Sequence, residues 1–352
     1  MEACPLDESE EVTAKGVAAE DVRFDEASPV TGSSRIEAAW SATEDESASV
    51  GGNVEATGHV FTQTYLPWSG TLNPRWARNW AVYRHHLAGL VRSGHRPWPV
   101  LVRLYLLLVL IGAAADVFPI LLSSVLGDAN ATLTIFAVSR NSLYAHVLGF
   151  FPRNILYYPV VTALIVGTMI SEDRLNGTSA LYFSRPISRL DYVGMKYLAA
   201  ATVLGILCVG TLLLYYFAEV IALGRGWAWV VDTLPLLMAA VAAGLLLVIT
   251  YTSLGLGLSS VSTNGYFPAI GLLALVLGTK SLASLLDLLF ERDVLFLLSP
   301  YDALANVGQH LLGIESNYNL PWTWSLVSVV LMNALALYVL AGRVASMEVT
   351  RE

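Results

Sequence analysis

The sequence of 352 residues has little charge and almost no cysteine. Only 14% of its residues are charged, against about 25% in an ordinary soluble protein, while 55% are hydrophobic. A purely soluble enzyme is therefore not expected. The two cysteines, Cys4 and Cys208, cannot form a disulfide framework or a zinc site of several thiolates. Redox chemistry at paired thiols is excluded for the same reason.

Acidic residues are concentrated at the start of the chain. Residues 1–60 hold 14 of the 28 Asp and Glu but only three basic residues, and few of their side chains are large and apolar. Such a segment buries too little surface to offset the entropy of ordering. We interpret it as a disordered acidic cytosolic tail, which is either a solvated extension or a regulatory docking segment. The rest of the chain has a net charge of +3, which suits a surface near anionic lipid headgroups.

Residues 61–98 are interpreted as a linker followed by an amphipathic helix. Apolar residues recur at helical spacing from Trp76 and Trp80 through Tyr83 to Leu87, and basic residues lie mostly off this stripe. Because the segment precedes an apolar run, we expect the helix to lie in the cytosolic interface of a lipid bilayer. A helix that binds a calmodulin-like partner is the alternative.

Long apolar runs occupy residues 99–352. A helix needs about 20 apolar residues to cross the hydrocarbon, and the unbroken runs exclude the alternating pattern of a membrane barrel. We therefore expect an all-α, polytopic bundle of six transmembrane helices. The expected spans are Leu104–Leu122, Ile155–Ile170, Tyr197–Leu223, Leu234–Val261, Tyr266–Leu286 and Trp324–Leu340. Lys280, near one end of the fifth, is expected to extend toward the interface.

The distribution of Lys and Arg predicts the orientation. With a cytosolic N-terminus, twelve basic residues near the spans lie inside and five outside. Basic residues are enriched on the cytoplasmic side of membrane proteins. We therefore expect a multi-pass protein of the plasma (inner) membrane with both termini in the cytosol. Residues 284–320, between the last two spans, are expected to form short amphipathic helices on the outer surface, which either cap the exit of a pathway or pad the interface.

The segment from residue 171 to 196 has the densest signal. Gly177 is expected to end a helix that descends from the membrane, and Thr178 is a suitable N-cap for a short helix. Pro186 ends that helix, and Ser188 with Asp191 fits a capping box for the next. This pattern predicts a short helix exposed on the cytosolic side. The alternative is an ordinary loop whose charges only enforce the topology.

The same residues resemble the signature of the ATP-binding cassette (ABC) type-2 permease family, in which a Glu that ends the second span precedes Gly-Thr and Arg-Pro-Ile/Val-Ser-Arg. The matching positions are Glu172, Gly177, Thr178, Arg185, Pro186, Ile187, Ser188, Arg189, Tyr192 and Lys196. The resemblance extends from about residue 70 to the C-terminus. It implies half of an exporter whose 171–196 element couples to a separate ATPase through Glu172, Gly177, Thr178, Arg185, Pro186, Arg189 and Lys196. It also implies a second permease subunit, in a homodimer or a heterodimer.

An ATP site is not expected in this chain. A phosphate-binding loop needs Gly-x-x-x-x-Gly-Lys-Ser/Thr, and the nearest string, Gly278–Ser281, has a different spacing and lies in an expected span. ATP and Mg²⁺ are therefore expected on the partner ATPase, and no cofactor on this chain. No metal site and no nucleic-acid partner are expected.

Three residues within the spans are candidates for the substrate pathway. Asp116 is costly in hydrocarbon unless it faces water or the bundle interior, although a kinked, solvated helix end near Pro119 also explains it. Tyr251 belongs to a polar patch, and Asn333 could instead form an interhelical hydrogen bond.

Two other classes of function stay open. An intramembrane enzyme would need paired acids or a nucleophile with a base at membrane depth. A membrane anchor or sensor would use the acidic tail as an interaction arm.

Overall fold

The computed structural model describes residues 74–91, 97–126, 138–148, 157–177, 187–264 and 266–349, all within one compact unit, Thr71–Glu352. Every regular element in these ranges is helical. The α-helices are α2 (Arg75–Val91), α3 (Pro97–Leu126), α5 (Arg140–Val147), α6 (Tyr158–Val166), α7 (Ser171–Leu175), α9 (Arg189–Gly205), α10 (Thr211–Ala222), α11 (Trp227–Val261), α12 (Tyr266–Leu273), α13 (Thr279–Phe290), α14 (Pro300–Leu312) and α15 (Trp322–Val349). Two π-helical turns, η2 (Ile206–Gly210) and η3 (Ala274–Gly278), and one 3₁₀ segment, η4 (Asp293–Leu298), complete the set. The predicted acidic tail lies outside the described residues.

Four helical stretches in the described ranges are long and apolar enough to cross a membrane. They are Arg189–Ala222, Trp227–Val261, Tyr266–Phe290 and Trp322–Ser346, and they coincide with the last four predicted spans. The first predicted span lies in α3, where a shorter apolar stretch covers Leu106–Leu122. The part of the fold that these ranges cover is thus all-helical, with four candidate spans.

The second predicted span, Ile155–Ile170, is not one continuous helix. Its helix α6 ends at Val166, a turn covers residues 167–170, and α7 begins at Ser171. The chain packs closely at this turn, because a Cβ on Gly167 would lie 3.1 Å from atoms of Ala269 in α12. The apolar run in the sequence therefore predicts a longer helix than the one that the fold contains.

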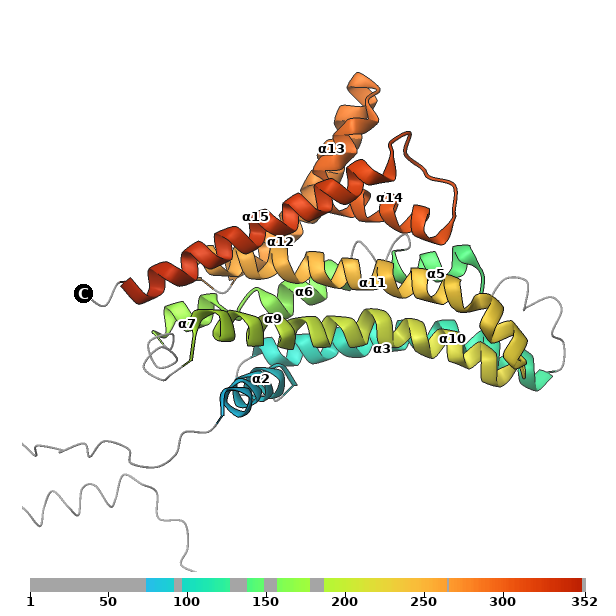
Figure 1. Cartoon of the computed structure of the whole chain (residues 1–352), viewed down its shortest axis with the longest axis horizontal. Coiled ribbons are helices and arrows are strands. Elements are labelled where there is room, and N and C mark those ends of the chain that lie inside the picture. Colours follow the sequence, from blue (N-terminus) through green and yellow to red (C-terminus); the bar gives the residue numbers. More distant parts are fainter. Residues whose placement is uncertain are drawn as a thin grey trace, which may run out of the picture. The chain divides into compact units, whose positions relative to one another are not determined.

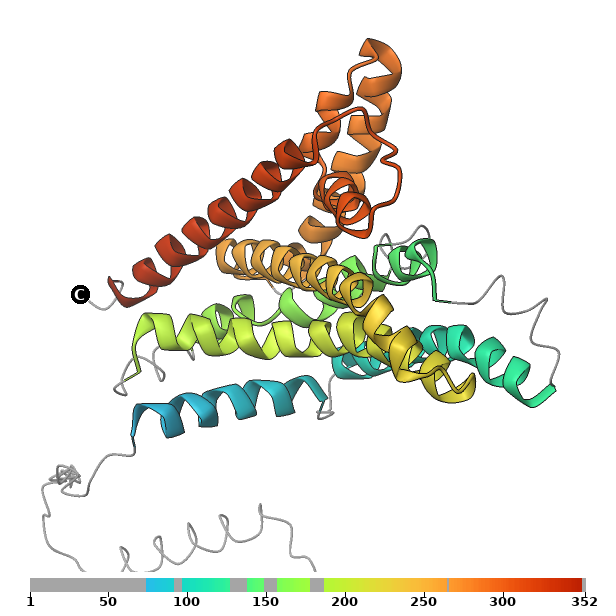
Figure 2. The ribbon, with the colours of Figure 1, turned by 45° about the vertical axis from the view of Figure 1, so that its right-hand side comes forward.

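Helix α11 is the centre of the packing. It contacts α6, α9, α12, α14 and α15, and it lies between α15 and α9 (Figures 1 and 2). The contact with α15 depends on Gly257, where a Cβ would lie 3.0 Å from the carbonyl oxygen of Ala336. Small residues at such crossings let helix backbones approach closely.

The π-helical turns lie inside two of the long stretches. Thr279, which follows η3, donates from its hydroxyl to the carbonyl of Leu275 at 2.5 Å. After η3 the chain changes direction, and α13 leaves the line of α12 (Figure 1). A side-chain hydroxyl that bonds back to the helix backbone is a known cause of such bends.

Within residues 284–320, helix α14 does not lie on the surface of the bundle as a surface amphipathic helix would. Helix α14 is buried along most of its length and packs against α11, α13 and α15. Its N-cap is Ser299, whose side chain accepts a hydrogen bond from the backbone N–H of Asp302. Its Asn306 donates to Ser325 of α15 at 2.8 Å. Polar side chains of α14 therefore bond within the bundle.

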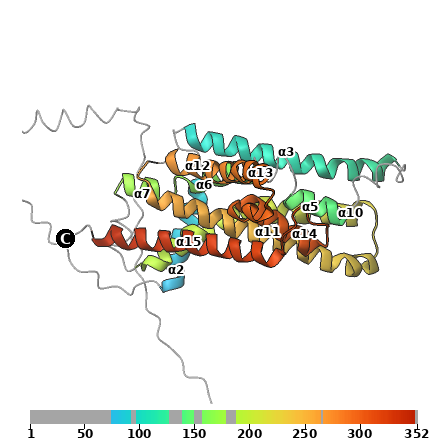
Figure 3. The same cartoon turned by 90° about the horizontal axis from the view of Figure 1, so that it is seen from above.

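Helix α2 lies across the direction of α9 and α11, at the end of the bundle where α9 begins (Figures 1 and 3). It contacts α9 and α3. Val82 and Tyr83 are buried, whereas Trp76 and Trp80 are exposed. The Tyr83 hydroxyl donates to Thr202 of α9 at 3.1 Å. The helix thus has one face on the bundle and a tryptophan face turned away from it.

Candidate functional site

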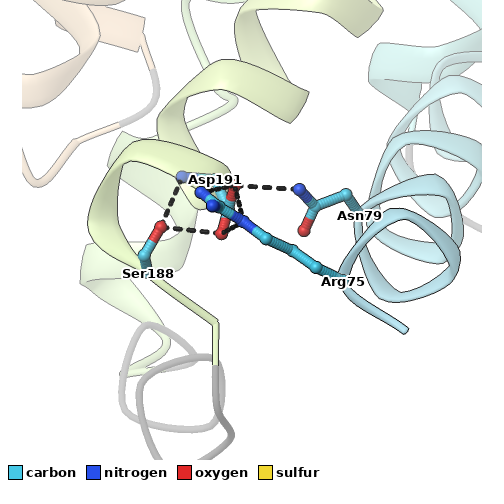
Figure 4. A network of polar contacts seen from close by, with 4 residues as sticks. All are labelled: Arg75, Asn79, Ser188 and Asp191. Atoms are coloured by element: carbon cyan, nitrogen blue, oxygen red, sulfur yellow. Dashed lines mark hydrogen bonds and ion pairs between the residues drawn. The ribbon is translucent and has the colours of Figure 1, made fainter. Parts of the chain in front are cut away.

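The start of α9 carries a network of polar contacts, drawn in Figure 4. Ser188 is the N-cap, as predicted, and its hydroxyl oxygen accepts from the backbone N–H of Asp191 at 3.1 Å. The same hydroxyl donates to the Asp191 carboxylate at 2.7 Å. An N-cap of this kind satisfies one of the unpaired N–H groups of the first helical turn. The cap also orients the carboxylate of Asp191.

Two residues of α2 bind the Asp191 carboxylate (Figure 4). The Arg75 guanidinium donates through Nη2 at 2.8 Å and through Nε at 3.0 Å, and the Asn79 amide donates at 2.8 Å. Asp191 is nearly buried, while Arg75 is exposed. The paired donors of arginine fix geometry as well as charge. The helix that lies across the bundle is therefore tied to the first turn of α9.

A second network joins α9 to α7. The ammonium of Lys196 lies 2.6 Å from the Asp173 carboxylate and also donates to the carbonyl of Met169 in the 167–170 turn. The Tyr192 hydroxyl donates to the same carboxylate at 2.6 Å. Lys196 and Tyr192 are at most 1% exposed, and Asp173 is 15% exposed. A buried ammonium group is costly unless it is paired in this way.

The end of α11 holds the other side of α7. The Ser259 hydroxyl accepts from the backbone N–H groups of Ile170 and Ser171, at 3.1 and 3.2 Å. The Arg174 guanidinium donates to the carbonyl of Ser260. Because α7 has only five residues, these contacts and those of Lys196 determine where it lies.

His86 of α2 lies close to the Lys196 network. Burial, and then the positive charge of Lys196, lower its pKa to about 3. Asp173 acts in the opposite direction and His85 in the same direction as Lys196. His86 is therefore neutral at physiological pH.

The predicted coupling residues fall into three groups. Gly177 and Arg189 are exposed and lie on either side of residues 178–186, and Glu172 is half-buried in α7. Gly177 has φ of +65°, which supports its predicted role as a helix end. Lys196 is buried and faces Asp173 instead of solvent. Thr178, Arg185 and Pro186, with the predicted short helix, lie outside the described residues.

In the described part of the chain, no contact brings the three predicted pathway residues together in one cavity. Tyr251 is fully buried in α11. The Asn333 amide donates to Thr250 of α11 at 3.1 Å, which is the geometry of the interhelical alternative. Asp116 lies in α3, and its side chain is outside the described part of the structure.

Sequence reasoning missed an ion pair between α13 and α14. Instead of extending to the interface, Lys280 bonds Asp302 at 3.0 Å, and its ammonium lies 3.8 Å from the centre of the Tyr301 ring. The Tyr318 hydroxyl also donates to Asp302, at 2.8 Å. Asp302 is 1% exposed. The signal in the sequence was a lysine in an apolar span together with an Asp in the first turn after Ser-Pro.

The sequence was compared with known proteins. A search of curated proteins finds no match. The family model described as "ABC-2 family transporter protein" matches residues 80–344, which include nearly all the described helices. Because this match covers well over half of the chain, the protein belongs to the ABC-2 transporter family and is a multi-pass membrane component of transport.

Proposed function

We propose that the chain is the permease subunit of an ATP-driven exporter, and that ATP is hydrolysed on a separate ABC ATPase subunit. The family match supports a transport component. The nearest string to a phosphate-binding loop, Gly278–Ser281, lies in η3 and α13 within a candidate span, which is unsuitable for ATP.

The observation that carries the proposal is that the helices on both sides of residues 178–186 are held by side-chain contacts. On one side, α7 is held by Lys196 and by the end of α11. On the other side, the first turn of α9 is held by Arg75 and Asn79 of α2. A push on the segment between these edges would pass to α9, α11 and α2 together. This is what a coupling element needs, because coupling travels through packed elements that move as units.

The proposed topology places six spans in the plasma membrane, with both termini in the cytosol. Helix α3 supplies the first span, and the broken run through α6 and α7 supplies the second. Helix α2 then lies in the cytosolic interface with Trp76 and Trp80 at headgroup depth, as expected of exposed tryptophans beside basic residues.

A second permease subunit, either another copy or a related chain, completes the pathway in this proposal. Asp116 is the candidate for its lining. Tyr251 is buried and Asn333 is partly buried with its amide bonded to Thr250, so both would act on the pathway by positioning α11 and α15.

The proposal is tested with the full chain purified from its native membrane. An ABC ATPase is expected to co-purify with it. After reconstitution in vesicles, Glu172→Ala and Arg189→Ala are each expected to lower the stimulation of ATPase activity by about tenfold or more. Loss of one partner of a desolvated charge pair at a protein interface costs about 2 to 5 kcal/mol.

Arg343→Ala is the matched control, since Arg343 is exposed at the end of α15 and lies outside the element. Stimulation at the wild-type level in both test variants would remove these residues from coupling. Absence of any ATPase partner would favour the intramembrane enzyme or the anchor and sensor with its acidic arm.

A further inference from the structure

A partly polar cavity of about 380 Å³ lies between α5, α11 and α14. Its polar lining includes Arg140, Asp232 and His310, and its apolar lining includes Leu236 and Ala239. The cavity is far from the α7–α9 networks along the bundle, because α5 and the end of α10 lie opposite α7 and the start of α9 (Figure 1).

The position of Arg140 is fixed by its surroundings. The residue opens α5, which is capped by Ser139. The backbone N–H of Val138 just before it donates to the buried carboxylate of Glu219 in α10. The Arg140 guanidinium donates to the carbonyl of Gly313 at 3.1 Å.

Gly313 makes room for this arginine. Its φ is +64°, and a Cβ there would lie 2.6 Å from the Arg140 guanidinium. A side chain at residue 313 would therefore displace Arg140. One of the five N–H donors of an arginine is used by the Gly313 carbonyl, and the geometry of the others matches the oxygens of a phosphate.

The other two polar groups are also placed for binding. The His310 ring stacks on Trp322 with centroids 4.5 Å apart and planes 9° from parallel. Asp232 is exposed, and in the described part of the chain no ion pair or hydrogen bond engages its carboxylate. The cavity thus presents one guanidinium and one available carboxylate beside an apolar wall.

This charge balance selects the ligand. A simple anion would be attracted by Arg140 but repelled by Asp232. A simple cation would be attracted by Asp232 but repelled by Arg140. A molecule with a phosphate ester at one end and an amine at the other satisfies both residues. The apolar wall of Leu236 and Ala239 suits an attached hydrocarbon chain, and it belongs to a candidate membrane span.

We propose that this cavity binds a zwitterionic phosphate ester of the phosphoethanolamine type, with its phosphate on Arg140 and its amine on Asp232. The cavity lies at the end of a membrane-spanning helix, so its ligand is the headgroup of a bilayer phospholipid. The inference rests on the proposed function in one respect, namely that its topology places this headgroup in the outer leaflet.

The test measures lipid binding by the full chain without any ATPase. The chain is purified in detergent, and its retention of phosphatidylethanolamine and of phosphatidylglycerol, which lacks the amine, is measured by native mass spectrometry. Wild type is expected to retain phosphatidylethanolamine at least about tenfold better. Arg140→Ala should abolish this retention, and Arg140→Lys should keep part of it. Asp232→Asn should lose the preference, because phosphatidylglycerol is no longer repelled.

Asp287→Asn, on α13 and away from the cavity, is the charge control. Soluble phosphoethanolamine is added as a competitor, and displacement at micromolar concentration would identify a free solute instead of a lipid as the ligand. Equal retention of both lipids by wild type, or wild-type retention by Arg140→Ala with an unchanged melting temperature, would overturn the proposal. Because ATPase stimulation is not measured, this result is independent of the coupling experiment.

Discussion

Lys196 shows how one buried charge determines the position of a short helix. Its ammonium, at most 1% exposed, has Asp173 and the Met169 carbonyl as partners. Asp173→Asn leaves the ammonium buried without its counter-charge and is expected to destabilise the fold by about 3 to 5 kcal/mol. The double variant Asp173→Leu/Lys196→Met should recover much of this loss, because both charges are gone. Unfolding in mild denaturing detergent measures the difference.

A control keeps this result specific. Arg343→Met removes an exposed positive charge and should change stability by less than about 1 kcal/mol. Asp173→Leu and Lys196→Met are also made singly. If their losses of stability simply add in the double variant, the two side chains do not interact and the proposed pairing is wrong.

His86 makes stability depend on pH. A histidine in an unfolded chain has a pKa of about 6.5, and burial beside Lys196 lowers the folded value to about 3. The unfolded chain therefore binds more protons below pH 6.5, so the stabilising contribution is complete above that pH and is lost as the pH falls toward 3. Between pH 7 and pH 5 the loss should be at most about 2 kcal/mol. Thermal unfolding of wild type and His86→Gln at both pH values tests this, and an identical pH dependence in the two proteins would contradict it.

At the scale of elements, the crossing of α11 and α15 depends on one glycine. A Cβ at residue 257 would lie 3.0 Å from the Ala336 carbonyl and 3.2 Å from its side chain. Gly257→Ala is therefore expected to force the helices apart and to lower stability by about 1 to 3 kcal/mol. Gly342→Ala in α15 is the control, since nothing lies within 4 Å of its Cβ position. There the change should be neutral or slightly stabilising, because alanine favours a helix. A similar melting temperature for both variants would show that the crossing tolerates a methyl group.

Elements that depend on nearby residues could be predicted from the sequence. The N-cap at Ser188 needs only Asp191 three residues later, and the last four spans need only continuous apolar runs. The partners of Lys196 and Lys280 could not be predicted, because they lie 23 and 22 residues away along the chain. Their pairing depends on how the helices pack, and no local spacing encodes it. For the same reason α14 looked like a surface helix: its polar residues find their partners on α13 and α15.

At the scale of the whole molecule, the membrane topology decides whether the α7–α9 networks can couple to an ATPase and whether the Arg140 cavity can bind an outer-leaflet lipid. Helix α7 and the start of α9 lie toward one end of the bundle and α5 toward the other (Figure 1), and Arg140 of α5 lines the cavity. Only if the first end is cytosolic can an ATPase reach residues 178–186 while the cavity meets the outer leaflet. The excess of basic residues at the first end predicts this orientation.

Cysteine labelling tests the orientation in sealed cells. Cys208 is buried and Cys4 is replaced by Ser in the starting protein, so a membrane-impermeant maleimide should react mainly with an introduced cysteine. Thr178→Cys is expected to be modified only after the cells are opened, whereas Glu315→Cys, in the loop that follows α14, should react in intact cells. Glu315 is exposed and lies close to the end of α14 that borders the cavity. Ready labelling of Thr178→Cys from outside would invert the topology, and both the coupling role and the outer-leaflet assignment would then fail together.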